Sequence, residues 1–282
     1  MNTYPYFNKI SNFPDINNMK IEIPKKREYL EFIKSNFNNI SQREIARRLK
    51  LGKTTINRWA EEIGLRFKKH TVNEKFFDEF NERSSYILGL IFSDGNVSWN
   101  TQKGYYSLTI TASEKDKDHL ENIRSTLSST KPLLYSSKTK SYRLIVTNKN
   151  ICKRLMQLGV IPRKSLSVKF PNIPGEYLNQ FIRGIIDGDG HVRYVKRKKS
   201  PYFEITIASG SKVFCEGLVN SIKQAIGVNA NIRKVKKNTH IIQYSCSRGE
   251  KLANYVYSNA NIFLERKYLP YKNNILRRDE NG

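Results

Sequence analysis

The sequence predicts an α+β protein in which a small helical unit precedes a core made of two copies of one αββαββα arrangement. Three observations lead to this prediction. One pattern, Gly-(Leu/Ile)-Ile-x-x-Asp-Gly, occurs twice, within residues 87–95 and 182–190. The same order of strand-like and helical segments follows each copy. Before the first copy, residues 27–66 show helical periodicity around a glycine-containing turn, which indicates a separate helical unit.

The helical unit has the pattern of a helix-turn-helix. A first helix is expected at 27–37, and Ser41 with Glu44 forms the capping-box pattern that begins the next helix. Gly52 marks a turn, and a further helix is expected at 53–63. The predicted divisions of the chain are a flexible arm at 1–26, a helix-turn-helix DNA-binding domain at 27–70, a linker at 71–83, and two core halves at 84–170 and 171–282.

The outward face of the helix at 53–63 carries side chains that donate hydrogen bonds. Such side chains can bind phosphates and reach base edges in a major groove. An ordinary three-helix unit with solvated polar positions is the alternative. The residues concerned are Lys53, Thr54, Thr55, Asn57 and Arg58.

Each core half is expected to form a sheet with one apolar and one polar face. Leu108, Ile110 and Ala112 alternate with polar residues in the first half, and Phe203 and Ile205 do so in the second. The polar faces, rich in Thr, Ser, Arg and Lys, predict saddle-shaped sheets that could hold DNA. The expected strands are 96–101, 105–112, 133–135 and 142–146, then 191–196, 203–208, 231–236 and 241–245, with helices at 115–127, 151–158, 212–225 and 250–258.

The charge of the chain favours a polyanionic partner. Fifty Lys and Arg residues against 25 Asp and Glu residues give a formal net charge of +25, and the excess is spread along the whole chain. This distribution is typical of an extended nucleic-acid footprint. The alternative is a lysine-rich organism whose proteins carry solvated lysines everywhere.

Several other functions have little support. The three cysteines are widely separated without a CxxC pair, which indicates a reducing compartment, and the four histidines show no metal-ligand spacing. The apolar run near the first motif is too short to span a membrane, and the N-terminus lacks the order of a signal peptide. We therefore expect no membrane partner, no secretion, and a cytoplasmic (nucleoid-associated in a bacterium) or organellar location.

Small residues one helical turn apart predict that the two motif helices pack closely together. These are Gly89 with Ser93 and Gly184 with Gly188. Such packing would relate the halves by a pseudo-twofold axis and bring the carboxylates at the two helix ends side by side. The glycines that follow, 95 and 190, are expected to adopt the left-handed conformation that ends a helix.

Two close carboxylates at helix C-termini repel each other, and the helix dipoles add to the cost. A divalent cation would relieve this repulsion, and hard oxygen ligands suit Mg²⁺ or Mn²⁺. The expected metal site consists of Asp94 and Asp189 with the residues that precede them, Ser93 and Gly188. Such a site is suited to metal-assisted hydrolysis of a phosphodiester.

The segments Gly89–Gly95 and Gly184–Gly190 resemble the paired motifs of LAGLIDADG homing endonucleases in their single-chain, two-motif form. The resemblance covers about residues 84–270 and leaves the helix-turn-helix as an added module. It implies one catalytic aspartate per DNA strand and a staggered double-strand break across the minor groove. Lys164 and Lys267 resemble the active-site lysines of the family by position, although ordinary surface lysines are the alternative.

Basic residues elsewhere in the core are candidates for contact with DNA. Runs after a strand and at a hairpin could bind phosphates, or could be solvated charges; two strand arginines could contact bases. The phosphate candidates are Lys196, Arg197, Lys198, Arg233 and Lys234, and the base candidates are Arg143 and Arg193.

These observations predict a monomeric, site-specific DNA endonuclease of the homing type that uses Mg²⁺ or Mn²⁺. Its expected partner is double-stranded DNA with a long, nearly asymmetric target site. A transcription regulator that binds DNA without cutting is the first alternative, although both acidic residues are retained. An RNA maturase that assists splicing of an intron RNA is the second.

Overall fold

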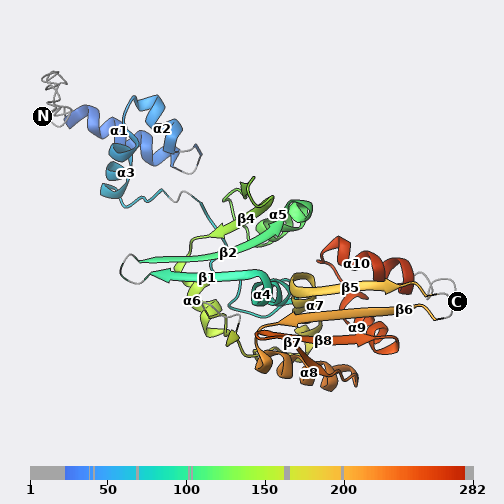
Figure 1. Ribbon diagram of the computed structural model, residues 1–282. Coiled ribbons are helices and arrows are strands. Elements are labelled where there is room, and N and C mark those ends of the chain that lie inside the picture. The colour runs from blue at the N-terminus through green and yellow to red at the C-terminus, as the bar shows by residue number, and fades with distance from the viewer. Residues whose placement is uncertain are drawn as a thin grey trace, which may run out of the picture. The chain divides into compact units, whose positions relative to one another are not determined.

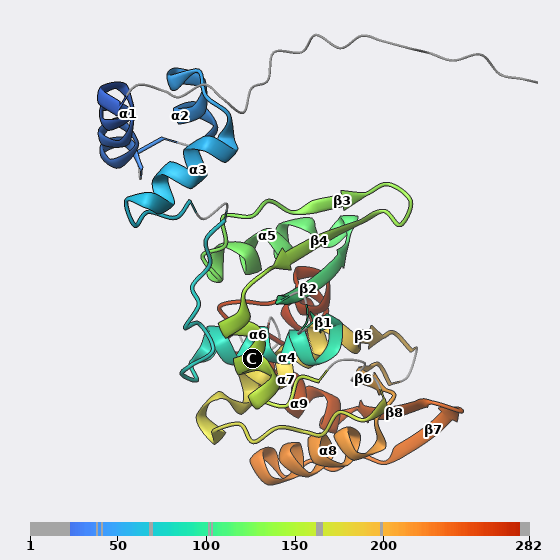
Figure 2. The same ribbon diagram turned by 90° about the vertical axis from the view of Figure 1, so that its left-hand side faces the viewer.

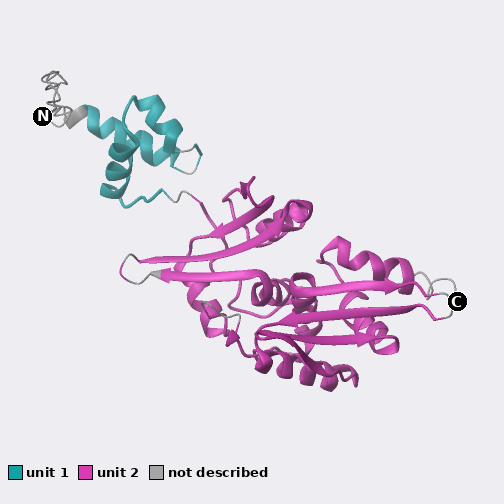
Figure 3. Cartoon of the chain, viewed as in Figure 1, with its two compact units in different colours: residues 1–69 teal, residues 70–282 magenta. Residues whose placement is uncertain are grey.

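The computed structural model describes residues 23–37, 39–40, 42–67, 70–100, 102, 104–161, 166–197 and 200–276. The chain divides into two compact units, residues 1–69 and 70–282 (Figure 3). Each unit has its own hydrophobic core, so each is described by itself.

The described residues of the first unit form three helices, α1 (Ile23–Asn36), α2 (Gln42–Leu49) and α3 (Lys53–Glu62). Ile33, Ile45, Ile56 and Trp59 lie in its buried centre. Ile56 and Trp59 are three residues apart on α3, which is the spacing that places apolar side chains on one helical face. A short turn joins α2 to α3 and ends at Gly52, which precedes α3 without a side-chain cap. The predicted N-cap of α2, position 41, lies outside the described residues.

The second unit contains two four-stranded antiparallel sheets, with strand orders β1-β2-β4-β3 and β5-β6-β8-β7 (Figure 1). The predicted αββαββα order is confirmed in both halves, and the second half continues into a further helix that the sequence analysis did not predict. The first half comprises α4 (Glu82–Asp94), β1 (Gly95–Asn100), β2 (Tyr105–Ser113), a 3-10 turn (Glu114–Asp116), α5 (Lys117–Thr126), β3 (Leu134–Ser136), β4 (Ser141–Val146) and α6 (Lys149–Gln157). The second half comprises a 3-10 turn (Gly175–Tyr177), α7 (Leu178–Asp189), β5 (Gly190–Val195), β6 (Tyr202–Ser209), α8 (Lys212–Ile226), β7 (Ile232–Lys236), β8 (Thr239–Ser245), α9 (Ser247–Tyr257), α10 (Glu265–Tyr271) and a final π-helical turn (Lys272–Leu276).

The two sheets match in register as well as in strand order. Gly95 pairs with Ile110 across β1 and β2, and Gly190 pairs with Ile207 across β5 and β6. The next pairing is Ile110 with Leu144 in the first sheet and Ile207 with Ile242 in the second. All four of these apolar residues are buried, so each sheet turns one face to its helices and leaves the opposite face polar.

The helices α4 and α7 lie side by side between the two sheets (Figures 1 and 2). Both are buried along most of their length. The first begins with a capping box in which the Asn81 side chain accepts from the backbone N–H groups of Arg83 and Ser84. This cap fixes where α4 starts.

The glycines that follow the two motif helices are not left-handed, and this expectation was wrong. Gly95 has φ −80° and Gly190 has φ −85°, which is extended backbone that enters the next strand directly. Glycine is required here for space. A Cβ atom at Gly95 would lie 2.7 Å from the Cα atom of Ile91, and one at Gly190 would lie 2.5 Å from the carbonyl oxygen of Ile186.

Among the residues that the structure describes, no helix has the length and apolar character needed to cross a membrane.

Candidate active site at the paired motif helices

The two motif helices approach backbone to backbone at two glycines. A Cβ atom on Gly89 would lie 2.1 Å from the carbonyl oxygen of Phe181, and one on Gly184 would lie 2.1 Å from that of Tyr86. One turn further on, a Cβ atom on Gly188 would lie 1.9 Å from the Ser93 hydroxyl oxygen. The four small residues of the motifs therefore all lie at the contact between the helices.

The motif aspartates are the last residues of their helices, and both are exposed. Because Gly89 faces Gly184 and Ser93 faces Gly188, the two C-termini lie at the same end of the helix pair. The Asp94 carboxylate reaches the partner helix, since its Oδ2 atom would lie 3.2 Å from a Cβ atom at Gly188. Two negative charges thus share a helix end where the carbonyl dipoles are also negative.

Lys267 is placed at this end of the pair, but its ammonium faces the backbone. Its Nζ atom donates to the carbonyl oxygens of Ile186 at 2.9 Å, Asp187 at 2.6 Å and Gly188 at 2.7 Å. An ammonium has three donors, so these three bonds use all of them. The residue is 4% exposed, and in this geometry it holds the last turn of α7 instead of reaching toward a phosphate.

The electrostatic surroundings of Lys267 also report on the carboxylates. Burial lowers the pKa of Lys267 to about 8, and the negative charges of Asp187, Asp94 and Asp189 act in the opposite direction. Both motif carboxylates therefore lie close enough to stabilise the ammonium. The other predicted active-site lysine, Lys164, lies outside the described residues.

Asp187 lies beneath the site and joins the two halves of the core. Its carboxylate accepts hydrogen bonds from the Tyr86 hydroxyl at 2.8 Å, the Tyr257 hydroxyl at 3.0 Å and the Leu264 backbone N–H at 2.8 Å. Tyr86 belongs to α4, whereas Tyr257 belongs to α9. Burial raises the pKa of Asp187 to about 6, despite these three donors. The side chain is only 2% exposed, so its place is structural.

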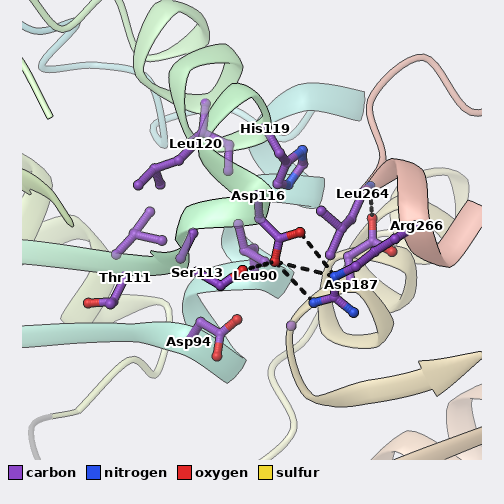
Figure 4. A pocket seen from close by; sticks show the side chains of 14 residues that line it. Leu90, Asp94, Thr111, Ser113, Asp116, His119, Leu120, Asp187, Leu264 and Arg266 are labelled. Atoms are coloured by element: carbon purple, nitrogen blue, oxygen red, sulfur yellow. Dashed lines mark hydrogen bonds and ion pairs between the residues drawn. The ribbon is translucent and has the colours of Figure 1, made fainter. Parts of the chain in front are cut away.

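A cavity of about 250 Å³ adjoins Asp94 and contains a second link between the halves (Figure 4). Arg266, at the start of α10, donates to Asp116 through Nε at 3.0 Å and through Nη2 at 3.1 Å. Burial would raise the pKa of Asp116, but the hydrogen bonds from Arg266 and Ser113 outweigh it and lower that pKa. The pair positions α10, and with it Lys267, against the first half. No local pattern predicts this pair, because Asp116 and Arg266 are far apart along the chain.

His119 lines the same cavity, and its Nε2 atom lies 3.0 Å from the Tyr86 hydroxyl oxygen. Burial lowers the pKa of His119 to about 4, although Asp116 acts in the opposite direction. Because this pKa lies below the ordinary value of about 6.5, the stability that His119 contributes is full above pH 6.5. It is lost as the pH falls through about 4.

Replacing His119 with glutamine should therefore change how stability depends on pH. The effect of Asp187 on stability has the opposite dependence on pH. Because its pKa is raised, the stability that it contributes is full below pH 3.8 and is lost as the pH rises through about 6. The wild-type profile mixes both effects, so the difference between wild type and His119→Gln is the informative quantity. From urea titrations, we expect this difference in unfolding free energy to be about 1–2 kcal/mol smaller at pH 5 than at pH 7.5. The exposed His70→Gln variant is the control, and an equal difference at both pH values would contradict the assignment.

The predicted DNA-contact residues of the core are placed on strands or at strand ends. Arg143, on β4, is exposed. Arg193, on β5, is paired with Glu204, a partner that the sequence analysis did not identify. The phosphate candidates Lys196, Arg197, Arg233 and Lys234 are exposed, and position 198 lies outside the described residues.

In the first unit, the predicted contact residues lie on α3. Lys53, Thr54, Asn57 and Arg58 are exposed, whereas Thr55 is half-buried. The Gln42 side chain of α2 donates to the Asn57 side chain at 2.7 Å. This bond ties the outer face of α3 to the start of α2.

The motif aspartates fit part of the ligand set of a divalent cation. Within the described ranges, no three or more His, Cys, Asp or Glu side chains are grouped so as to hold a metal. Mg²⁺ commonly uses one or two protein carboxylates, several waters and the phosphates of its substrate. Asp94 and Asp189 supply two exposed carboxylates at one helix end, whereas the Gly188 carbonyl oxygen accepts from Lys267.

Comparison with known proteins identifies relatives of this core. A model of the LAGLIDADG-like domain matches residues 176–261. The uncharacterized protein MJ0398 of Methanocaldococcus jannaschii is 29% identical over 222 residues, which cover 73% of this chain and 77% of that protein.

Two of the solved structures that are similar to the core are complexes with DNA. The structure of I-DmoI in complex with DNA and Ca is 18% identical and has a TM-score of 0.50, covering 68% of this chain and 97% of that one. The I-LtrWI LAGLIDADG homing endonuclease bound to target DNA is 16% identical and has a TM-score of 0.48, covering 70% of this chain and 90% of that one. The second half therefore contains a LAGLIDADG-like domain, and the core has the fold of the single-chain, two-motif LAGLIDADG homing endonucleases.

Proposed function

We propose that this protein is a site-specific double-strand DNA endonuclease of the homing type, which hydrolyses phosphodiesters with Mg²⁺ or Mn²⁺ and leaves staggered ends. One observation carries the proposal. Two exposed carboxylates, Asp94 and Asp189, end two helices that pack backbone to backbone and finish at the same place. The calcium and DNA in the I-DmoI complex support a divalent cation and a duplex as the partners of this fold.

The chemistry follows from what each residue can supply. When bound, the divalent cation supplies an activated water and neutralises charge on the leaving oxygen. Asp94 and Asp189 provide the negative charge that holds it, one from each half, so each half acts on one strand. Lys267 and Asp187 fix the end of α7, so the carboxylates are positioned before DNA arrives.

The rest of the molecule supports a long duplex contact by a single chain. The polar face of each sheet lies opposite the buried apolar face, and a net charge of +25 favours phosphates with a steep dependence on salt. The exposed donors of α3 provide a second DNA-binding surface. Because the two halves differ in sequence, the target site is nearly symmetric in layout but asymmetric in bases.

A DNA-binding regulator that does not cut is the second candidate, and one observation favours it. All three donors of Lys267 are used by carbonyl oxygens, so this lysine does not stabilise charge on a phosphate in the arrangement described. Loss of such a group lowers the rate of hydrolysis without affecting DNA affinity.

One experiment separates these functions. The full-length protein is mixed with Mg²⁺ and a library of randomised duplexes, and the resulting ends are sequenced. An endonuclease is expected to give discrete staggered cuts at one family of sites, and EDTA should abolish them. Enrichment of bound duplexes without cut ends would refute the proposal in favour of the regulator, and selective binding of intron RNA would favour a maturase.

A further inference from the structure

The polar face of the second sheet contains a carboxylate that is buried although it lies opposite the hydrophobic core. Glu204, on β6, is 2% exposed, and its neighbours Phe203 and Ile205 point into the core. Glutamate is rarely buried unless it is paired. The residues that pair with Glu204 therefore indicate the role of this part of the polar face.

Hydrogen bonds occupy both oxygens of Glu204. Its Oε1 atom accepts from Arg193 Nε at 2.7 Å and lies 2.6 Å from Arg193 Nη2 in an ion pair. Its Oε2 atom accepts from the Gln243 amide at 2.5 Å and from the Ser245 hydroxyl at 3.3 Å. The strand register places Arg193, Glu204 and Ser245 directly opposite one another across β5, β6 and β8. Gln243 accepts in turn from Arg233 of β7 at 2.5 Å, so the network crosses all four strands.

The first sheet has no counterpart of this network. Matching the registers of the two sheets places Ser98 and Ser107 where Arg193 and Glu204 lie. Their hydroxyl oxygens are 3.0 Å apart and form a short neutral pair. Ile145 holds the place of Gln243, and Leu134 holds that of Arg233. Only the second half of the core therefore presents a fixed charge at this level of the sheet.

The geometry decides which group can bind a base. A carboxylate has about four acceptor directions, and four donors already point at Glu204, so it cannot also accept from a base. A phosphate clamp is an equally poor fit, because a carboxylate beside a phosphate adds repulsion. The Arg193 side chain, in contrast, remains 51% exposed. With its Nε edge fixed, the Nη1–Nη2 edge is free to donate a parallel pair of hydrogen bonds, which is the geometry that O6 and N7 of guanine require.

We propose that Glu204 is a positioning residue which presents Arg193 to a guanine in the half of the target that the second sheet binds. No matching preference is expected in the other half, where Ser98 and Ser107 take the equivalent positions. Asp189 ends α7, and Arg193 lies on β5, which begins at the next residue. The inference rests on the proposed endonuclease function.

The test measures base preference by binding, so that it does not depend on cleavage. Full-length wild type, Glu204→Gln, Arg193→Lys and Ser245→Ala proteins are each used with EDTA to select duplexes from a randomised library. We expect wild type to select guanine at one position in one half-site. Glu204→Gln and Arg193→Lys should each reduce that preference about tenfold. Ser245→Ala keeps the Arg193–Glu204 pair and should retain it.

The controls separate a specificity role from a structural one. Arg193→Lys changes an exposed side chain, so it tests the proposal even if Glu204→Gln does not fold. A uniform loss of affinity at unchanged base preference would mean that the network only supports the sheet, and it would overturn the inference alone. If the wild-type protein selected no duplex, the proposed function would fail, and this inference would fail with it.

Discussion

Replacing Gly184 with alanine is expected to destabilise the second unit by about 3 kcal/mol, as overpacking of a tightly filled core does. The new methyl carbon would lie 2.1 Å from the carbonyl oxygen of Tyr86 and 2.7 Å from the backbone nitrogen of Leu90. Both are backbone atoms of α4, so no side-chain rotation can relieve the clash. The two helices must separate, and every contact along their buried faces loosens.

Thermal unfolding followed by circular dichroism measures this effect. For a unit of this size, the loss corresponds to a fall in Tm of roughly 6–12 °C. Gly175→Ala is the matched control, because a Cβ atom there meets nothing within 4 Å. Equal Tm values for the two variants would show that the helices do not touch at Gly184. Since Gly184 lies one turn before Gly188, the displaced helix end should also reduce cleavage.

The order of the elements could be predicted because its causes are local and repeated. The alternation at Leu108 and Ile110 reappears at Ile205 and Ile207, and all four residues are buried. The spacing of small residues in the motifs, such as Gly89 with Ser93, likewise predicts the contact between the two helices. A pattern that occurs twice in one chain provides its own check.

The parts that could not be predicted depend on contacts between residues distant in sequence. Lys267 resembles an active-site lysine by its position in the sequence. In the folded protein, however, α10 packs against α7, and the Lys267 ammonium donates to three carbonyl oxygens of α7. Glu204 sits on the polar side of an alternating strand, where a solvated carboxylate is the simplest interpretation. It is buried because Arg193 and Gln243 come from other strands to cover it.

The metal-ligand assignment predicts a second large effect, on cleavage instead of stability. Asp94→Asn and Asp189→Asn should each lower double-strand cleavage on the order of 10³-fold or more. A ligand of a catalytic cation supports several kcal/mol of transition-state stabilisation, and each 1.36 kcal/mol is a factor of ten. Folding should be unaffected, because both residues are exposed. Removing a negative charge from a helix C-terminus is neutral or slightly stabilising.

Asp187 provides a matched comparison on the same helix, only two residues from Asp189. Asp187→Asn should lower Tm, since the amide cannot accept all the hydrogen bonds that Tyr86, Tyr257 and Leu264 donate to the carboxylate. Asp189→Asn should keep the wild-type Tm and lose cleavage. Duplex affinity in EDTA is expected to stay level or rise for Asp189→Asn, because one source of repulsion toward phosphate is gone. If both Asp94→Asn and Asp189→Asn retained cleavage, the helix ends could not be the active site, even if the protein binds DNA. Loss of folding in Asp189→Asn would instead show that the Asp189 carboxylate is needed for the structure, and it would contradict its assignment as a metal ligand.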